Sequence, residues 1–293
     1  MIKRAGRGHD LAGVNATTAG ACAILCPACP QPNLNLSDQV PHGAPDHKYV
    51  CCSVDMSPCS CALRWKSRMA IAIDACFKLK RKARDIKDVE LGSGWAYFVN
   101  EDSYQAYLKD CPDNKEISPC TSELNAVKQA YSKGSNAGIA VTGVVGVKCA
   151  RHAFVLLNGI ADLQKGERYC NVDYAVLSVL SCLSIRKLGE VDLSYDIACS
   201  WTKNFIKRAA NVPVDAASDI SEVAIRPLIP KAHIEGHGPS CRTKYSFNYA
   251  VGVGCGHGET TEEEWAIIIR TTISTREMGP GTRHATLNDH WGW

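Results

Sequence analysis

The sequence predicts an α/β protein that follows an irregular N-terminal segment. Short apolar runs with a two-residue period alternate along the chain with segments of helical period, and we find no internal repeat or low-complexity tract. The 293 residues, 45% of them hydrophobic, are enough to bury a sizeable core. Residues 1–68 are instead rich in Pro, Cys and polar residues without a period, so we expect the ordered core to begin near residue 69.

Five segments have the pattern of strands. MAIAID, from Met69 to Asp74, is the first, and the alternating FKLKRK after it predicts a second. GWAYFV from Gly94 and GIAVTGVVGV from Gly138 predict two more. EVDLSYDIA alternates apolar with polar residues and places Asp196 at the far end of a fifth strand.

Helices are predicted between and after these strands. VDYAVLSVLSCLSIRKL, from Val172, ends in basic residues and then Gly189, as a helix C-terminus requires. A second helix is expected to pass through Trp201. In GETTEEEWAIII, Thr260 and Glu263 have the spacing of a capping box, which predicts a third.

Charge and hydropathy limit the classes of protein. The 33 Lys+Arg and 30 Asp+Glu leave a net charge of +3, so an anionic partner must meet a local basic patch. KLKRKARDIK is such a patch: Lys78, Lys80, Arg81 and Lys82 would suit DNA phosphates or nuclear import, with a solvated strand face as the alternative. No window reaches ~18 uninterrupted apolar residues, so we expect no membrane span, and we expect no secretion signal.

Cysteine is unusually frequent, with 16 residues. Without a secretion signal, clustered cysteines indicate metal ligands in a reducing compartment. Cys26 and Cys29 in CPAC, and Cys149 and His152 in CARH, are two-ligand knuckles that would form one structural Cys₃His Zn²⁺ site if the fold brings them together. Simply buried thiols, with a solvated or capping histidine, are the alternative.

A further histidine pair stands near a cysteine. His233 and His237 in KAHIEGH, with Cys241, have a spacing compatible with metal or phosphate contact. Partly buried histidines with satisfied hydrogen bonds are the alternative.

Three carboxylates are candidates for a different kind of metal site. Asp74 and Asp196 each end a predicted strand, and Glu262 falls on the apolar face of the helix predicted in GETTEEEWAIII, with Glu259 as an alternative. Two strand aspartates and a helix glutamate are what RNase H-like nucleic-acid enzymes need to hold two Mg²⁺ ions during phosphodiester displacement. From spacing alone the signal is weak, and unrelated surface or capping acids are the favoured alternative.

Eight blocks of this sequence resemble, in the expected order, those of the KDZ (Kyakuja–Dileera–Zisupton) transposases, which are abundant in fungal genomes. The blocks cover roughly residues 20–38 and 69–293 and read CPACPQPNLNL, IDACFKLKRK, CARHAFVLLNGIADLQKGERYCNVDY, SYDIACSW, IPKAHIEGHGPSC, KYSFNYAVGVG, GETTEEEWA and STREMGPGTRH.

The resemblance implies a DDE-type catalytic domain with an RNase H-like mixed sheet flanked by helices. Such a domain cuts and rejoins DNA at transposon ends with Mg²⁺ or Mn²⁺, and we expect it in the nucleus. Mapped by motif, the catalytic and metal-binding acids fall on Asp74, Asp196 and Glu262. The CPAC and CARH knuckles also match family positions.

The sequence departs from the family pattern at several positions. Cys76 stands where the family usually has Asn, Glu263 where it has Arg, and His257 where Asp is common. Residues 39–68 do not resemble the family, and we expect residues 69–293 to form a catalytic domain with helical insertions and a shortened C-terminal end. The alternative to an active enzyme is an inactive, transposase-derived protein that binds DNA or protein. For the oligomeric state, a monomer and a homo-oligomer both stay as alternatives.

Overall fold

The structure is a computed structural model of the 293-residue chain. The described residues are 11–31, 35, 68–86, 88–111, 138–183, 188–213, 220, 223–254 and 256–292. Most of the predicted irregular segment, residues 36–67, therefore lies outside them. Its described part contains a short 3-10 helix, η2 (Val14–Ala16), and otherwise turns and extended chain.

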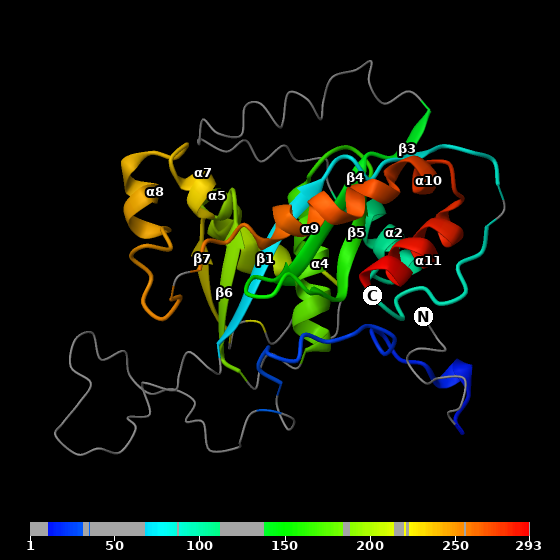
Figure 1. The fold of residues 1–293 in the computed structure, drawn as a ribbon, viewed down its shortest axis with the longest axis horizontal. Coiled ribbons are helices and arrows are strands. Elements are labelled where there is room, and N and C mark those ends of the chain that lie inside the picture. The colour runs from blue at the N-terminus through cyan, green and yellow to red at the C-terminus, as the bar shows by residue number, and fades with distance from the viewer. Residues whose placement is uncertain are drawn as a thin grey trace.

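A five-stranded mixed sheet forms the centre of the structure (Figure 1). The strand order is β5-β4-β1-β6-β7, in which β5, β4 and β1 are antiparallel while β6 and β7 run parallel to β1. A separate pair is formed by β2 and β3. The strands are β1 (Met69–Cys76), β2 (Arg81–Lys82), β3 (Ile139–Val141), β4 (Gly143–Cys149), β5 (Val155–Leu163), β6 (Glu190–Tyr195) and β7 (Ala224–Leu228).

Helices cover both faces of this sheet (Figure 1). One face is covered by α4 (Tyr169–Cys182), which packs on β4 and β5, and the other by α9 (Thr260–Ile268), which packs on β1 and β4. The other helical segments are α2 (Glu101–Asp110), α5 (Ala198–Trp201), η5 (Thr202–Asn204), α6 (Phe205–Ala209), α7 (Lys231–Ile234), α8 (Pro239–Lys244), η7 (Ile269–Thr271), α10 (Thr272–Arg276) and α11 (Pro280–Trp291). Among the described helices, none is both long and apolar enough to cross a bilayer.

Strand β4 shows how the sequence builds two cores at once. Every residue of β4 is buried, because helices cover the sheet on both sides. Side chains alternate between the faces, so Val145, Val147 and Cys149 join the core beneath α4, while Val144 and Lys148 face α9. Each buried valine contributes on the order of 1.5–3 kcal/mol of hydrophobic free energy.

Strands β1 and β6 and helix α4 form close to where the sequence predicts them, whereas other elements differ. The run from Gly94 makes only a single bridge, between Phe98 and Ile160. The side chain of Asn288 accepts hydrogen bonds from the amides of Tyr97 and Phe98, and a few backbone hydrogen bonds, such as Val99 N–H to the carbonyl of Ile160, join the run to β5. The run from Gly138 forms two strands, β3 and β4. Of FKLKRK, only the last two residues form a strand, β2.

Candidate functional site

Asp74 and Asp196 occupy neighbouring parallel strands at the centre of the sheet. Asp74 lies in β1, and Asp196 directly follows β6, whose last residue, Tyr195, pairs with Ile73. Adjacent strands lie about 4.8 Å apart. The backbone positions of the two predicted strand acids are therefore next to each other, one step beyond the last pair of the ladder.

Asp74 is held by the helix that covers this face of the sheet. The indole Nε1–H of Trp265 donates a 2.8 Å hydrogen bond to Oδ2 of Asp74. Burial raises the pKa of Asp74 to about 6, and the nearby carboxylate of Glu262 adds to this increase. The hydrogen bond from Trp265 and the charge of Lys148 oppose this increase without cancelling it, so Asp74 takes up a proton more readily than an ordinary aspartate.

Asp196 faces two histidines. Its Oδ1 lies 3.2 Å from Nδ1 of His233 and 3.5 Å from Nε2 of His237. Burial would raise the pKa of Asp196, but the hydrogen bonds and charge of the two histidines outweigh burial and lower it. Asp196 therefore stays a carboxylate at neutral pH.

Both candidate glutamates lie at the start of α9 and meet the same histidine. Oε1 of Glu262 is 3.1 Å from Nε2 of His233, and Oε2 of Glu259 is 3.7 Å from it. Glu259 Oε1 also accepts a 2.7 Å hydrogen bond from the amide of Ala232. The N-cap is Glu259 and not Thr260, so the predicted capping box does not form, because Glu259 already closes the first turn.

His233 joins these acids into one group. The pKa of His233 is raised to about 9, first by its hydrogen bond to Asp196 and further by Glu262 and Glu259, against the effect of burial. Its positive charge thus lies among three carboxylates. Carboxylate oxygens are the hard ligands that Mg²⁺ and Mn²⁺ prefer, so this donor set fits such an ion.

Lys148 positions α9 and was missed by sequence reasoning. Its fully buried ammonium contacts the carboxylate of Glu264 and lies 3.0 Å from the centroid of a Trp265 ring. A Cβ added at Gly146 would come within 2.7 Å of that indole, so glycine lets the helix approach the strand. The signal available in the sequence is a lone lysine within an apolar strand, which requires a buried partner.

Two departures from the family pattern lie near each other. Nε2 of His257 is 3.9 Å from Oε1 of Glu263. Cys76, the third departure, is buried in the core beneath α9.

The predicted basic patch is only partly free of other contacts. Lys78 is exposed, and Lys80 and Arg81 are partly buried. Nζ of Lys82 forms a 2.6 Å surface ion pair with Glu277. The end of the patch nearest β1 is therefore the part best placed to meet an anionic partner.

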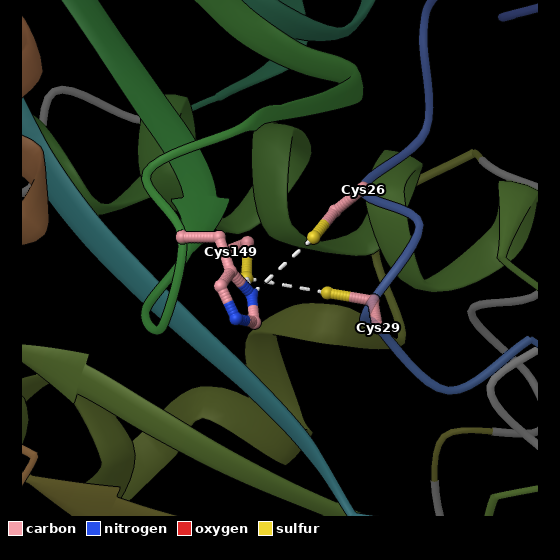
Figure 2. A group of neighbouring side chains, drawn as sticks. Cys26, Cys29 and Cys149 are labelled. Atoms are coloured by element: carbon pink, nitrogen blue, oxygen red, sulfur yellow. Dashed lines mark hydrogen bonds between the residues drawn. The ribbon is translucent and has the colours of Figure 1, made fainter.

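The two cysteine knuckles converge as the sequence predicts. Figure 2 shows Cys26 and Cys29, from the N-terminal segment, facing Cys149 at the end of β4. The Sγ atoms of Cys29 and Cys149 are 3.2 Å apart, and Nδ1 of His152 lies 3.4 Å from Cys26 and 3.5 Å from Cys149. All four ligand atoms lie within 4.8 Å of one another. Three thiols and one imidazole in this arrangement fit a tetrahedral Zn²⁺ ion.

The protonation of this cluster is already biased towards a thiolate. A hydrogen bond from Cys29 is the main cause that lowers the pKa of Cys149 to about 5, although burial opposes it. Burial raises the pKa of Cys26, and the neighbouring thiols raise that of Cys29. Cys149 is thus the first thiolate of the group, and a metal ion would be needed to stabilise the others.

A buried ionic network fastens α11 to the sheet. The guanidinium of Arg283 donates two hydrogen bonds, of 2.7 and 2.9 Å, to the carboxylate of Asp162 in β5, and His284 lies 3.1 Å from the same carboxylate. Burial alone would raise the pKa of Asp162, but Arg283 and His284 hold it well below its usual range. This network gives a structural role to the acid in the GIADLQKGERY block.

Comparisons with known proteins agree with this arrangement. A family model described as Kyakuja-Dileera-Zisupton transposase matches residues 67–293. Searches of curated proteins and of solved structures found no match. The matched range includes the whole central sheet, α9 and the carboxylates gathered around His233, and it covers most of the chain. The chain therefore belongs to the Kyakuja-Dileera-Zisupton transposase family.

Proposed function

We propose that residues 69–293 form the catalytic domain of a DDE-type transposase that cleaves and rejoins DNA with a divalent metal ion at Asp74, Asp196 and Glu262. One observation carries the proposal. Asp196 and Glu262 contact the same imidazole, while Asp74 occupies the register position beside Asp196 and is hydrogen-bonded to the helix of Glu262.

The strand order supports an RNase H-like assignment for this domain. Three antiparallel strands, β5, β4 and β1, are continued by β6 and β7 parallel to β1, and α4 makes the crossover between β5 and β6. The two aspartates stand at adjacent register positions, in β1 and directly after β6, and Glu262 lies on α9, which packs on β1 and β4. Acids gathered from neighbouring strands and a covering helix are consistent with two-metal chemistry.

Each residue has a part in the proposed reaction. When bound, Mg²⁺ or Mn²⁺ would activate the attacking oxygen and stabilise the leaving oxygen of an in-line phosphodiester displacement. Trp265 fixes the orientation of the Asp74 carboxylate, and the two histidines keep Asp196 ionised. Lys148 holds α9 on the sheet and so places Glu262 opposite the strand acids.

We also propose how the domain meets its substrate. Lys78 is exposed four residues beyond Asp74, and Lys80 follows it, so cationic side chains come shortly after Asp74 along the chain. Lysines of this kind neutralise DNA phosphates without reading the base sequence. The substrate of the family is transposon DNA, and the nucleus is the corresponding location. The Cys26 knuckle would hold a structural Zn²⁺ that ties the N-terminal segment to β4.

One observation favours a second candidate, a catalytically inactive protein that binds DNA or protein. The positive charge of His233 already bridges Asp196 and Glu262, which reduces the need for a metal ion there. In that case the fold and the basic patch would serve binding alone.

A cleavage assay separates the two candidates. The full chain is incubated with supercoiled plasmid and with labelled oligonucleotides in Mg²⁺ or Mn²⁺. We expect nicking and strand transfer by the unaltered protein and by Glu263→Gln, an exposed neighbour on α9, and loss of both in Glu262→Gln and Asp196→Asn. Parallel DNA-binding measurements complete the test, since equal binding by all variants without nicking by any would support the binding protein.

A further inference from the structure

A second group of side chains with soft ligand atoms, two thiols and one imidazole, lies next to Asp196. It consists of Cys199 in α5, His237 between α7 and α8, and Cys241 in α8. Their ligand atoms all lie within 4.8 Å of one another, and Sγ of Cys199 is 3.6 Å from Nδ1 of His237. Cys199 and His237 are only 4% and 2% exposed, and Cys241 is partly buried.

We propose that this group binds a second Zn²⁺ ion through two thiolates and Nδ1 of His237. Thiolate and imidazole are the ligands that select zinc, whereas the oxygen donors around His233 favour Mg²⁺. Zinc–sulfur bonds of about 2.3 Å in a tetrahedron place the ligand atoms roughly 3–4 Å apart, which agrees with the observed spacing. Three protein ligands leave a fourth position for water.

The local chain explains why a metal ion is useful here. Helices α7 and α8 have four and six residues, which is too short for independent stability. Their connection folds back on itself through Arg242, which donates a 2.8 Å hydrogen bond to the carbonyl of His237. A zinc ion would fasten this connection to α5, directly after the strand that carries Asp196.

The proposed zinc ion would also orient Asp196 through the other ring nitrogen of His237. This second role rests on the proposed function. Nε2 of His237 is 3.5 Å from Oδ1 of Asp196. Zinc on Nδ1 would place the ring proton on Nε2, where it donates towards Asp196 in the manner of a carboxylate–histidine–zinc triad. His237 would thus be a positioning residue that orients one ligand of the acidic site through a structural metal ion.

Metal content tests the site directly. The full chain is loaded with Zn²⁺ under reducing conditions, freed of excess metal, and analysed by mass spectrometry. We expect about two zinc ions per chain, one of them lost in Cys241→Ser and the other in Cys29→Ser. Cys182→Ser, a partly buried cysteine outside both groups, is the matched control and should keep both. A Cys241→Ser protein with the zinc content of the unaltered chain would overturn the proposal.

A conservative variant guards against a simple folding defect. Cys241→His keeps a zinc ligand, so it should retain the second ion, and with Co²⁺ in place of zinc its thiolate-to-cobalt absorption should be weaker than in the unaltered protein. Loss of the ion in Cys241→His and Cys241→Ser alike, together with loss of native circular dichroism in both, would count against a specific site.

The positioning role has its own readout. Mn²⁺ affinity, measured by calorimetry on zinc-loaded protein, should fall in Cys241→Ser as well as in Asp196→Asn. Unchanged affinity in Cys241→Ser beside weakened affinity in Asp196→Asn would overturn the positioning role. Unchanged affinity in Asp196→Asn would instead contradict the proposed function, while the zinc count would still decide the second site.

Discussion

The indole of Trp265 donates a 2.8 Å hydrogen bond to the carboxylate of Asp74. This contact joins α9 to β1 across 191 positions of the sequence. Glu262 lies three residues before Trp265, one turn earlier on the same helix, so the bond that orients Asp74 also fixes the helix that presents Glu262. The same indole therefore helps to position two of the proposed metal ligands, Asp74 and Glu262.

Replacing Trp265 with Phe should weaken both the fold and the metal site. The change removes a hydrogen bond to a buried carboxyl, which typically costs about 1–2 kcal/mol of unfolding free energy, measurable by urea titration. Mn²⁺ affinity should fall as well, because Asp74 loses its orientation. Trp201→Phe is the control, since its indole donates a 2.8 Å hydrogen bond to Asp173, a buried carboxylate that is not among the proposed ligands. Equal Mn²⁺ affinity in the two variants would refute the role of Trp265.

Replacing Arg283 with Met should strongly destabilise the protein. The variant leaves the buried carboxylate of Asp162 without its bidentate partner, and breaking a buried ion pair in this way costs about 3–5 kcal/mol. Lys82→Met breaks a surface pair with Glu277 and should cost less than about 1 kcal/mol. Unfolding free energies of similar size for both variants would show that the buried network contributes no more than a surface contact.

Stability should fall as pH rises through the titration of His284. Burial lowers the pKa of His284, but the carboxylates of Asp162 and Glu90 outweigh this and raise it to about 9, from an ordinary value of 6.5. A raised histidine pKa means that its stabilisation is complete below pH 6.5 and is lost as pH rises to about 9. His284→Gln should flatten this part of the curve, measured by urea unfolding at each pH. Identical slopes for the variant and the unaltered protein would contradict the assignment.

Removing one ligand of the Cys26 knuckle should detach the N-terminal segment from β4. Cys29→Ser takes away a thiol that lies 3.2 Å from Cys149, so we expect less bound zinc and a lower unfolding temperature that added Zn²⁺ does not restore. Cys22→Ser changes a buried cysteine of the other core and should leave the zinc content unchanged. Equal zinc content in both variants would show that the converging thiols do not bind metal.

Local pattern was sufficient to predict the strands that carry the two aspartates. MAIAID is a short apolar run that ends in an acid, EVDLSY is apolar at alternate positions, and both form strands in the sheet. The CPAC and CARH spacings likewise predicted which cysteines would meet, because knuckles present two ligands locally and only one long-range contact remained to be made. In these cases residues that are close in the sequence determine most of the local structure.

Other features depend on partners far away in the sequence. The backbone amides of Tyr97 and Phe98 bond to the side chain of Asn288, and this segment with a strand pattern pairs with β5 through a single bridge. The apolar residues that follow GETTEEEW do not all stay on one buried helix face, because α9 ends at Ile268 and Ile273, five residues further on, is 85% exposed. No local signal shows which acid will pair with Lys148, since Glu264 is 116 positions away.

The alternation along β4 also restricts how this protein can misfold. Lys148 and Cys149 are neighbours that point to opposite faces, one into the ion pair with Glu264 and the other into the thiol cluster. A slip of β4 by one residue would exchange them, burying an ammonium among thiols and leaving Glu264 without its cation. Both changes would cost free energy of folding. Lys148 and Cys149 together therefore disfavour a pairing of β4 with β1 that is shifted by one residue.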